Sequence, residues 1–459
     1  MSKLNGDVLL HIFQSLHDLI NINFNNKKNY KNSLYSCLFV NKLWCETMIP
    51  VLWSYPYNYV YKKSLLFNII ISHLSNNSIK FLKDENIIAE NFQEQKLSFN
   101  YIRFCKYLNN IHEIFPNYDR RLRKEIYELF IRECSSIICL SYDMLDYSIC
   151  EFPNANVSLS NLSELECSRE QYFYDELAQI CRSIEKIKLK IIENGLSRVA
   201  KLIEMQKQIK YIFIEERVEC ERIAHALEKQ ANSIIYLNLE TYVHSLLYTL
   251  LPKLINLQFL RIHIEDKRSE KFKECIMNAG YYKLQILELQ NISLELAISI
   301  IQNTNGNLWK IKIRLACCNK AKEYNQTIYK YCPNIKYASV FLNRIETLEE
   351  LENIFIKCQH LKAIDIDEMI LEKYRDNFLE LVIKSAPPSL YKIHLSMMLD
   401  EFSEKTLNLF FSSWGCENKK TLHLYSRLTS CGRFTKGHKG VILYNYYDDD
   451  FWNHEITWD

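Results

Sequence analysis

Apolar residues recur in a six-residue pattern from residue 162 almost to the end of the chain. The pattern is L-x-x-L-x-L, with Ile, Ala, Val or Cys replacing Leu at some positions. Its copies begin at Leu162, Ile184, Ile209, Ile234, Leu257, Leu284, Leu308, Ile335, Leu361 and Leu390, in steps of 22 to 29 residues. Weaker copies begin at Ile137 and Lys419. Because side chains alternate along a strand, each copy predicts a short strand with one apolar face and one outward face.

The stretches between these strands have helical spacing, for example 217–230, 294–303, 348–357 and 374–384. A period of about 20–29 residues is typical of leucine-rich repeats, in which each unit buries its apolar side against its neighbours. We therefore predict an α/β fold with an irregular leucine-rich-repeat solenoid over residues 136–429. Its parallel strands would line a concave face and its helices a convex face. Glu265, Ile292 and Met369 occupy a position where Asn is usual, so uneven units are expected.

Residues 1–54 do not follow the repeat and predict a small helical module. The apolar residues of its first segment share one helical face, and they are Val8, Leu9, Ile12, Phe13 and Leu16. A second apolar pattern runs through Leu34, Cys37, Leu38, Leu43, Trp44, Met48, Leu52 and Trp53. Asn5, Gly6 and Asp7 precede the first helix and provide turn and N-cap chemistry.

This module resembles an F-box. The resemblance rests on residues 4–9, on Ile12, Phe13 and Leu16, and on 37–44 and 50–53. In that family the opening runs Leu-Pro-x-Glu-Ile/Leu-Leu and the middle runs close to Leu-Val-Cys-x-x-Trp. Here Asn5 replaces the Pro, which weakens the pre-set helix entry, and Asp7 replaces the Glu but keeps an anion near the helix N-terminus. Trp44 and Trp53, at their spacing, are the more specific part.

The resemblance implies a substrate receptor of an SCF-type (Skp, cullin, F-box) ubiquitin ligase. The adaptor-facing residues would be Leu4, Asn5, Ile12, Leu16, Leu38 and Val40. The same apolar positions could instead form the module's own core. Partners would be a Skp-family adaptor, through it a cullin ligase, and an unknown target protein.

Two segments flank the repeats. Residues 55–135 have helical spacing without a clear repeat and predict a helical connector. Residues 430–459 form an aromatic and acidic C-terminal tail with a strand expected at 441–447. This tail would cap the solenoid, or it would fold back over the basic strands as a lid.

The outward strand positions predict a surface for a target protein. They are Lys186, Lys188, Lys190, Tyr211, Phe213, Tyr236, Phe259, Arg261, Lys310, Lys312, Arg314, Tyr337 and Phe341. Aromatic residues between cations suit a protein ligand, because Tyr, Phe and Arg bring contact area at little entropy loss. Asp365 and Asp367 follow, so the face turns acidic. Outward strand positions are polar in most proteins, and that simpler explanation stays open for any single residue.

Composition narrows the function without naming it. The 459 residues carry a net charge of +2, which gives no general attraction to nucleic acid or anionic membranes. The 16 cysteines include no C-x-x-C, and positions such as Cys134, Cys181, Cys275 and Cys358 predict buried reduced thiols. The N-terminus lacks signal-peptide features and no apolar run is long enough for a membrane span. We therefore expect a cytoplasmic or nuclear protein.

Catalytic signatures are missing from the sequence. No H-E-x-x-H, G-x-x-x-x-G-K-S/T or G-x-S-x-G occurs. Asp448, Asp449 and Asp450 are more typical of a solvated turn than of a cation site. We expect no enzyme activity, no metal and no cofactor. The alternative to an SCF receptor is a leucine-rich-repeat scaffold without a ubiquitin role; a nucleic-acid binder and an undetected enzyme are weaker.

Overall fold

The computed structural model describes residues 5–22, 33–58, 63–109, 111, 119–141, 148–167, 173–190, 197–215, 221–240, 249–263, 270–314, 319–343, 345–367, 374–416, 420–427 and 440–445. The chain divides into two compact units, one built on Met1–Ile209 and the other on Lys210–Asn453. Leu4 and most of the C-terminal tail lie outside the described residues, and so do Asp448, Asp449 and Asp450.

The first unit begins with helices and continues as strand–helix repeats. Its helices are α1 (Gly6–Ile22), a short segment at 33–37, α3 (Lys42–Ser54), η2 (Pro56–Asn58), α4 (Lys63–Ile71), α5 (Asn76–Asp84), η3 (Ile102–Phe104), α6 (Arg120–Glu133), η5 (Ile149–Glu151), α7 (Ala155–Ser158), α8 (Phe173–Ile180) and α9 (Ser197–Glu204). Its strands are β1 (Tyr107–Leu108), β2 (Cys139–Ser141), β3 (Glu164–Cys167) and β4 (Lys186–Lys190). Within this unit β1 pairs in parallel with β2, β2 with β3, and β3 with β4.

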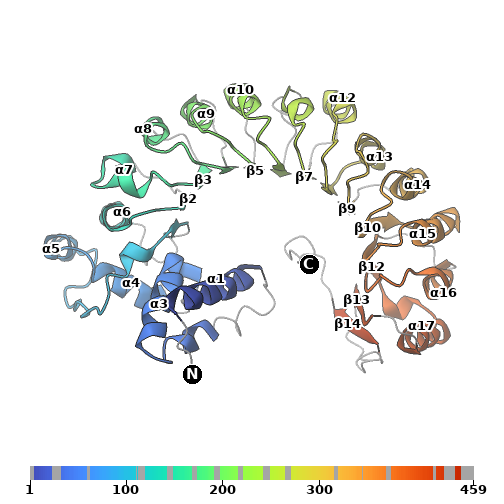
Figure 1. Ribbon diagram of the computed structural model, residues 1–459, viewed down its shortest axis with the longest axis horizontal. Helices are drawn as coiled ribbons and strands as arrows, with labels where there is room; N and C mark the ends of the chain where they lie inside the picture. Colours follow the sequence, from blue (N-terminus) through green and yellow to red (C-terminus); the bar gives the residue numbers. More distant parts are fainter. Residues whose placement is uncertain are drawn as a thin grey trace. The chain divides into compact units, whose positions relative to one another are not determined.

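The second unit continues the alternation. Its strands are β5 (Tyr211–Glu215), β6 (Tyr236–Glu240), β7 (Phe259–His263), β8 (Ile286–Gln290), β9 (Lys310–Arg314), β10 (Tyr337–Phe341), β11 (Ala363–Asp367), β12 (Lys392–Met398), β13 (Leu422–Arg427) and β14 (Val441–Asn445). Its helices are α10 (Glu221–Lys229), η6 (Leu251–Lys253), α12 (Glu270–Asn278), α13 (Leu294–Gln302), α14 (Ala321–Tyr331), α15 (Ile345–Lys357), α16 (Arg375–Ser385), η8 (Leu399–Glu401) and α17 (Glu404–Cys416). Figure 1 shows the strands of this unit on one side and its helices on the other.

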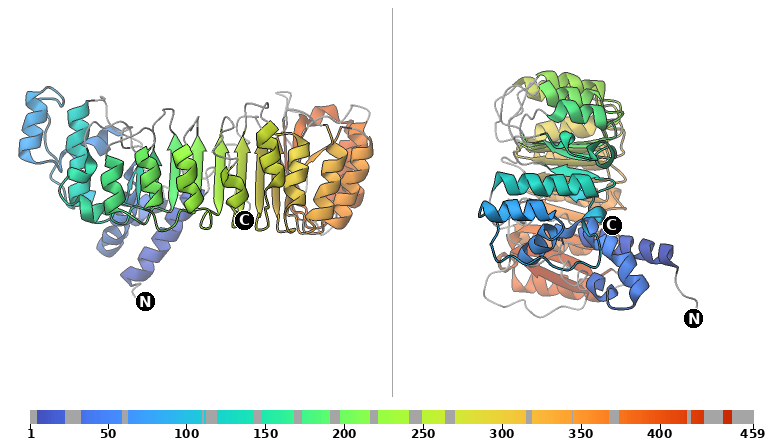
Figure 2. Two further views of the ribbon diagram at one scale, coloured as in Figure 1. Left: turned by 90° about the horizontal axis from the view of Figure 1, so that it is seen from above. Right: turned by 90° about the vertical axis from the view of Figure 1, so that its left-hand side faces the viewer.

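The strands of the second unit are all parallel, and their outward residues align in rows. Between β5 and β8 the central row runs from Phe213 to Asn238, Arg261 and Glu288 in register. Glu288 aligns in turn with Lys312 on β9. On β10 to β13 the corresponding row consists of Ser339, Asp365, His394 and Tyr425. Figure 2 shows the strands of successive repeats side by side. The parallel register therefore sets equivalent side chains of successive repeats beside one another.

The apolar residues of each repeat form the core between strands and helices. In the repeat that contains β5, the side chains of Ile209, Ile212 and Ile214 are buried, whereas Tyr211 of the same strand is exposed. This alternation confirms the predicted α/β leucine-rich-repeat fold, with parallel strands on one face and helices on the other.

Side-chain amides and hydroxyls also link adjacent repeats. Asn256 donates to the carbonyl of Asn232 at 2.7 Å, and Asn303 donates to that of Met277 at 2.7 Å. The Met277 carbonyl lies in the last turn of α12 and the Asn232 carbonyl in the turn after α10, where backbone carbonyls have no partner within a helix. Each repeat is therefore joined mainly to its immediate neighbours.

The parallel strand series starts earlier than the sequence pattern suggests. Strand β1 lies within the predicted connector 55–135 and pairs with β2, at the weak repeat copy that begins at Ile137. The connector otherwise contains α4, α5 and α6, as its helical spacing predicts. The two-residue β1 lacks an L-x-x-L-x-L signature, so its pairing could not be read from the pattern.

The described cysteines bear out the expectation of structural thiols. Eleven are free, and Cys134, Cys181 and Cys358 are buried as predicted, whereas Cys275 is partly exposed. Burial raises the pKa of Cys332 to about 12, so this thiol stays protonated at neutral pH.

No helix among the described residues is long and apolar enough to cross a membrane.

Candidate functional site

The N-terminal module closes around its own apolar core. That core consists of Leu9, Phe13, Leu34, Cys37, Met48, Val51 and Leu52. Trp44 of α3 packs edge-on against Phe13 of α1, with 5.4 Å between the ring centroids. Asn41 caps α3, because its side-chain oxygen accepts a hydrogen bond from the Trp44 amide at 3.0 Å. The module therefore has a complete interior of its own.

Five large apolar side chains of the described part of the module remain outside this core. We call them the module face, and they are Val8, Ile12, Phe39, Val40 and Leu43. Val8 and Ile12 stand four residues apart on one side of α1. Leu43 approaches the start of the same helix, since a Cβ placed on Gly6 would lie 3.9 Å from Leu43 Cδ1. Phe39 is 86% exposed, although burying a phenyl ring is normally favourable.

The residues predicted to contact an adaptor divide between this face and the core. Ile12 and Val40 belong to the module face, whereas Leu16 and Leu38 pack against the core as partly buried side chains. Asn5 is exposed, and its carbonyl accepts a hydrogen bond from the Leu9 amide at 3.1 Å. Leu4 lies outside the described residues.

The sequence interpretation missed three members of the module face. Val8 and Leu43 belong to the predicted apolar patterns of the module, and Phe39 lies in the segment 37–44 that carries the F-box resemblance. None of the three was assigned to a contact surface. Phe39 offered a signal, because it precedes the helix cap Asn41 in a turn. A large apolar residue in a turn has few neighbours to cover it.

The basic triplet of β4 is paired with acids of the neighbouring strand. Lys186 Nζ lies 3.1 Å from Glu164 Oε2, and Lys190 Nζ lies 2.8 Å from Glu166 Oε1, both acids being on β3. Lys186 keeps 41% of its side chain exposed. Lys188 is partly buried between them. Positive side chains of β4 therefore lie beside negative side chains of β3, and the triplet does not form a continuous cationic strip.

Four aromatic side chains line the first strands of the second unit. We call Tyr211, Phe213, Tyr236 and Phe259 the aromatic ladder. Tyr236 stacks on Phe259 with 4.0 Å between ring centroids and an interplanar angle of 6°. Phe213 lies 4.9 Å and Tyr211 lies 5.9 Å from the Tyr236 ring, centroid to centroid. The predicted row is therefore a connected apolar surface, and Tyr211 at its end is exposed.

A buried carboxylate, Glu288 on β8, joins cations from both flanking strands. Arg261 on β7 donates from Nε to Glu288 Oε2 at 2.7 Å, and Lys310 Nζ on β9 lies 2.7 Å from Oε1. The side chain of Glu288 is 2% exposed. Burial opposes its ionisation, but Lys310, Arg261 and Lys312 outweigh burial and lower the pKa of Glu288 to about 2. Glu288 is therefore a buried anion that binds three strands together.

Asp365 on β11 is a second buried carboxylate. Its Oδ1 lies 2.8 Å from His394 Nδ1, and its Oδ2 accepts from Ser339 Oγ at 3.1 Å and from Tyr337 Oη at 3.3 Å. Burial again opposes ionisation, but attraction to His394 and Lys312 holds the pKa of Asp365 below its usual value. Asp365 thus connects β10, β11 and β12.

Two lysines are buried near these carboxylates. Lys312 on β9 and Lys392 on β12 are each 7% exposed. Burial lowers the pKa of Lys312 to about 8 against the attraction of Glu288. Burial, with repulsion from Lys310 and Lys312, lowers the pKa of Lys392 to about 7. The Lys392 ammonium also lies 4.8 Å from the ring centroid of Tyr425.

We call this group the charged network. It consists of Arg261, Glu288, Lys310, Lys312, Asp365, Lys392 and His394. The sequence interpretation placed Arg261, Lys310 and Lys312 on the outward face but missed Glu288, Lys392 and His394. Aligning the repeats could have revealed these residues. Glu288, for example, occupies the same position in its strand as Arg261 and Lys312 do in theirs.

Two aromatic residues predicted to contact a partner are buried instead. Phe341 is fully buried and packs edge-on against Tyr324 of α14, with ring centroids 5.4 Å apart. Tyr337 is 3% exposed and directs its hydroxyl to Asp365. Alternation along the strand places both residues outward, but the neighbouring helix and strand cover them. Arg314 is partly buried at the end of β9.

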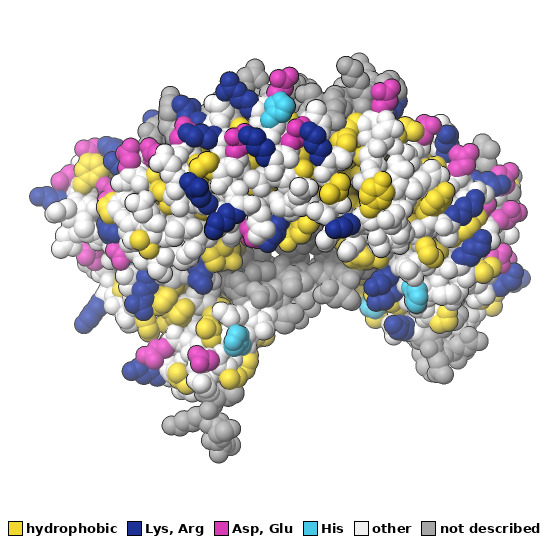
Figure 3. Space-filling model, turned by 45° about the horizontal axis from the view of Figure 1, so that its top comes forward, with side chains coloured by type: hydrophobic (Ala, Val, Ile, Leu, Met, Phe, Trp, Pro, Cys, Tyr) yellow, Lys and Arg dark blue, Asp and Glu magenta, His cyan; other side chains and the backbone are white. Residues whose placement is uncertain are grey.

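Charged side chains outside the network are mixed in sign. On the face that Figure 3 shows, basic and acidic side chains are interspersed over the described part of the surface, in keeping with the net charge of +2. Within the described ranges, no group of three or more His, Cys, Asp or Glu side chains could hold a metal ion. The described side chains of this region thus form an apolar aromatic ladder beside a group of buried ions.

The chain is similar to a solved leucine-rich-repeat structure, but neither a family model nor a curated protein matches it. Among solved structures, the chain is similar to the leucine-rich repeat-containing protein LegL7 from Legionella pneumophila. The identity is 15%, the match covers 58% of this chain and 84% of that chain, and the TM-score is 0.30. The leucine-rich-repeat fold stated above rests on the repeat pattern and on the parallel strands and helices of each unit.

Proposed function

We propose that this chain is a non-catalytic receptor that brings a target protein to an SCF-type ubiquitin ligase. In this proposal the module face docks on a Skp-family adaptor, and the aromatic ladder with the charged network holds the target. The receptor would act by proximity, raising the effective concentration of a target lysine near the reactive thioester. The free, protonated thiols agree with action in the cytoplasm or nucleus, where cysteines stay reduced.

The observation that carries the proposal is the module face. The core of the module is filled without Val8, Ile12, Phe39, Val40 or Leu43, yet these side chains remain in solvent. Exposed apolar side chains that gather on one small module are typical of a protein–protein contact. The F-box resemblance of the same segment supports a Skp-family adaptor as the partner.

The aromatic ladder supports the target-binding half. Tyr211 is 37% exposed, and the stacked Tyr236 and Phe259 are held in place by register and by each other. Aromatic residues dominate binding hot spots, because they contribute large contact area with few rotatable bonds. Arg261 extends this surface into the charged network, so a target with apolar and charged groups side by side would match it.

The test is co-expression of the full chain with a Skp-family adaptor, followed by size-exclusion chromatography. We expect a stoichiometric complex that the double variant Phe39→Asp/Val40→Asp abolishes, since two charges would be buried at the contact without partners. Val157→Asp on α7 is the matched control, because Val157 and Val40 are both 54% exposed. A full chain that folds but binds no adaptor contradicts the ubiquitin role, as does a complex that the double variant leaves intact.

A leucine-rich-repeat scaffold without a ubiquitin role is the second candidate. It is favoured by the position of the aromatic ladder and the charged network, which lie in the second unit and make their contacts there. The substitution Tyr211→Asp tests it, with Tyr282→Asp, at an exposed tyrosine outside the strands, as control. A target lost only in Tyr211→Asp, together with no adaptor complex, would favour the scaffold.

A further inference from the structure

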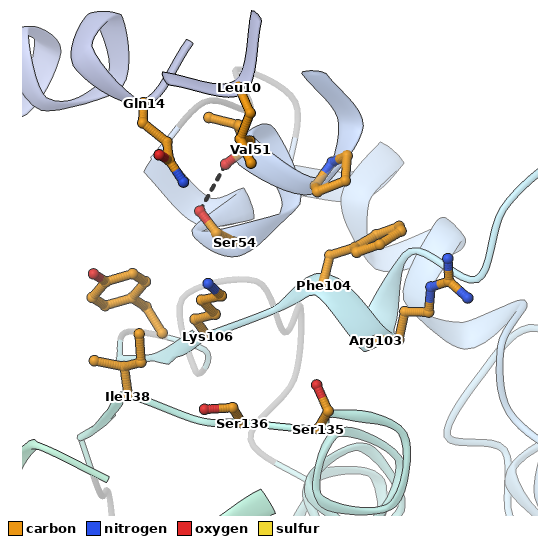
Figure 4. A pocket seen from close by; sticks show the side chains of 12 residues that line it. Leu10, Gln14, Val51, Ser54, Arg103, Phe104, Lys106, Ser135, Ser136 and Ile138 are labelled. Atoms are coloured by element: carbon orange, nitrogen blue, oxygen red, sulfur yellow. Dashed lines mark hydrogen bonds between the residues drawn. The ribbon is translucent and has the colours of Figure 1, made fainter. Parts of the chain in front are cut away.

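A pocket of about 480 Å³ lies in the first unit, and the cations that line it do not converge. Its lining includes Leu10, Phe104, Ile138, Arg103 and Lys106. In Figure 4, Arg103 lies beyond Phe104 and is turned away from Lys106. The cations of the second unit, in contrast, lie in register on nearby strands and act on one another.

One row of strand residues crosses β9 to β13 near the end of the sheet. We call it the basic row, and it consists of Lys310, Tyr337, Ala363, Lys392 and His423 in register. Two lysines and a histidine belong to this row, and none of its residues is a carboxylate. On β14 the row continues with Ile442, which is exposed. The basic row therefore begins beside β14.

The cations of the basic row repel one another. Burial lowers the pKa of Lys392 to about 7, and repulsion from Lys310 and Lys312 contributes to this shift. Burial also lowers the pKa of His423, and the charge of Lys392 adds to that shift. Because Lys392 is buried, charges near it interact through a medium that screens less than water. A negatively charged group placed along the row would therefore be attracted.

An aromatic stack joins the basic row to β14. Tyr425 of β13 stacks on Tyr444 of β14, with 4.5 Å between the ring centroids and an interplanar angle of 9°. Tyr444 Oη also lies 2.9 Å from His423 Nδ1. The Lys392 ammonium lies 4.8 Å from the centroid of Tyr425. The chain therefore leaves β14 beside the basic row.

The segment that follows β14, residues 446–459, has the opposite charge and lies outside the described residues. It contains no Lys or Arg, and its acids are Asp448, Asp449, Asp450, Glu455 and Asp459. We call the first three of them the acidic triplet. Its aromatic residues are Tyr446, Tyr447, Phe451, Trp452 and Trp458. Anionic and aromatic groups thus occur in one short stretch, which complements a row of cations beside aromatic rings.

The acidic triplet is close enough in sequence to reach the basic row. It begins three residues after Asn445, where β14 ends. Lys392 on β12 stands two strands from β14, which is about 10 Å at the usual spacing of about 4.8 Å between strands. An extended chain advances about 3.3–3.6 Å per residue, so the triplet can lie about 10–18 Å from Asn445. The sheet does not have to rearrange for this contact.

We propose that residues 446–459 bind back along the basic row, with the acidic triplet beside Lys392 and Lys310. The segment is tethered at β14, so its effective concentration at the row is on the order of millimolar and a modest attraction holds it there. Lys310 and Lys392 belong to the charged network, so a partner that uses this network has to displace the segment. The contact goes beyond the function proposed above, because it involves this chain alone, with or without a ubiquitin role.

The first test is carbodiimide cross-linking of the full chain, followed by peptide mapping. The reagent joins a carboxylate to an amine where the two are in contact. We expect links from the acidic triplet to Lys310 or Lys392 in the monomeric fraction. The pair of Lys253 and Glu228, with 2.6 Å between Nζ and Oε2, is the internal control. If the control pair is linked while the triplet is linked to no lysine of the row, or is linked only in a dimer, the proposal is wrong.

The second test is competition by a labelled synthetic peptide of residues 446–459, followed by fluorescence anisotropy. The full chain is compared with its triple variant Asp448→Asn/Asp449→Asn/Asp450→Asn. We expect the peptide to bind the triple variant about tenfold more tightly than the wild type, because the tethered segment of the wild type already occupies the row. Equal affinities overturn the proposal.

Two further variants make this test specific to the row. Lys392→Met, added to the triple variant, should weaken peptide binding about tenfold, because it removes a cation that faces the acids. Glu346→Gln/Glu349→Gln removes two exposed acids of α15 and should bind the peptide as the wild type does. Peptide binding that Lys392→Met leaves unchanged places the segment elsewhere and contradicts the proposal. Neither test contains an adaptor or a target, so failure here is distinct from failure of the proposed function.

Discussion

Strands β4 and β9 carry nearly the same outward triplet, Lys-x-Lys-x-Lys and Lys-x-Lys-x-Arg, in very different surroundings. On β4, Lys186 and Lys190 pair with partly exposed acids of strand β3. On β9, Lys310 binds Glu288, whose side chain is 2% exposed, and Lys312 is itself 7% exposed. The difference lies in the neighbouring strands and not in the triplets.

The contrast is between exposed ion pairs and buried ion pairs, which differ in how much they contribute to stability. Exposed ion pairs contribute about 0–1 kcal/mol, since water solvates each partner nearly as well alone. A buried carboxylate that loses its charge leaves its cations without compensation in a medium of low polarity, at a cost of about 3–5 kcal/mol. The ion pairs between β3 and β4 should therefore tolerate the loss of one partner, whereas the buried carboxylates of the charged network should not lose their charge.

The largest effect is expected from Glu288→Gln. Arg261 and Lys310 would keep their partly buried charges without the buried counterion, and we expect the free energy of unfolding to fall by about 3–5 kcal/mol. Glu164→Gln, which breaks the matching pair on β3, should lower it by less than about 1 kcal/mol. Urea denaturation of both variants measures the difference. Equal losses would remove the distinction between the two triplets.

Asp365→Asn should have the next largest effect. It removes the charge that His394 faces and weakens the hydrogen bonds from Ser339 and Tyr337, for an expected loss of about 2–3 kcal/mol. The matching control is Glu166→Gln, which breaks the exposed ion pair between Glu166 on β3 and Lys190 on β4. If Asp365→Asn were as well tolerated as Glu166→Gln in the same urea series, the β11 end of the network would not contribute to stability.

The substitution Lys392→Met tests the comparison through the pH dependence of stability. The folded pKa of Lys392, about 7, lies below its ordinary value of 10.5. Between these values the unfolded chain holds a proton that the folded chain lacks, so stability rises with pH across this window. At pH 7 the variant should be more stable than the wild type by about 1 kcal/mol or more, because a buried charge is replaced by an apolar chain. Unfolding midpoints at pH 7 and pH 9.5 provide the measurement, and an unchanged pH dependence in the variant would contradict it.

The smallest effect is expected from Lys186→Gln/Lys190→Gln. Both side chains are partly exposed, and the free energy of unfolding should change by less than about 1 kcal/mol in total. The small loss should vanish in high salt, which screens exposed pairs. A loss larger than about 1 kcal/mol would show that the ion pairs between β3 and β4 are more than surface charge.

The repeat pattern predicted most of the fold, because it records burial directly. The copies that begin at Leu162, Ile209 and Leu308 each precede a strand, β3, β5 and β9, with the expected alternation. Strand β1 was not predicted, because a strand of two residues is too short to show a periodic pattern. The apolar residues of the N-terminal module were recognised, but the pattern alone could not separate its core from its exposed face.

The site was predicted less completely, for a physical reason. Periodicity states which way a side chain points from its strand but not what lies beside it. Tyr236 and Phe259 were predicted as outward positions, but their stacking on each other was not predicted. Phe341 was predicted to point outward, although Tyr324 of a helix covers it. Aligning outward positions of adjacent repeats would have set Glu288 between Arg261 and Lys312, because parallel register puts equivalent residues side by side.

The charged network also bears on how the repeats come apart. Elsewhere in the second unit, side-chain bonds such as Asn256 to Asn232 join one repeat to the next, and such arrays open in pieces from their ends. From Arg261 on β7 to His394 on β12, side-chain contacts link successive strands into one block. Glu288 pairs with cations of β7 and β9, Asp365 pairs with His394 and accepts from Ser339 on β10, and the Ile313 amide of β9 donates to Ser339 Oγ at 3.0 Å. Under force or protease, fraying should therefore halt at β7 from one side and at β12 from the other, and amide hydrogens between them should exchange together.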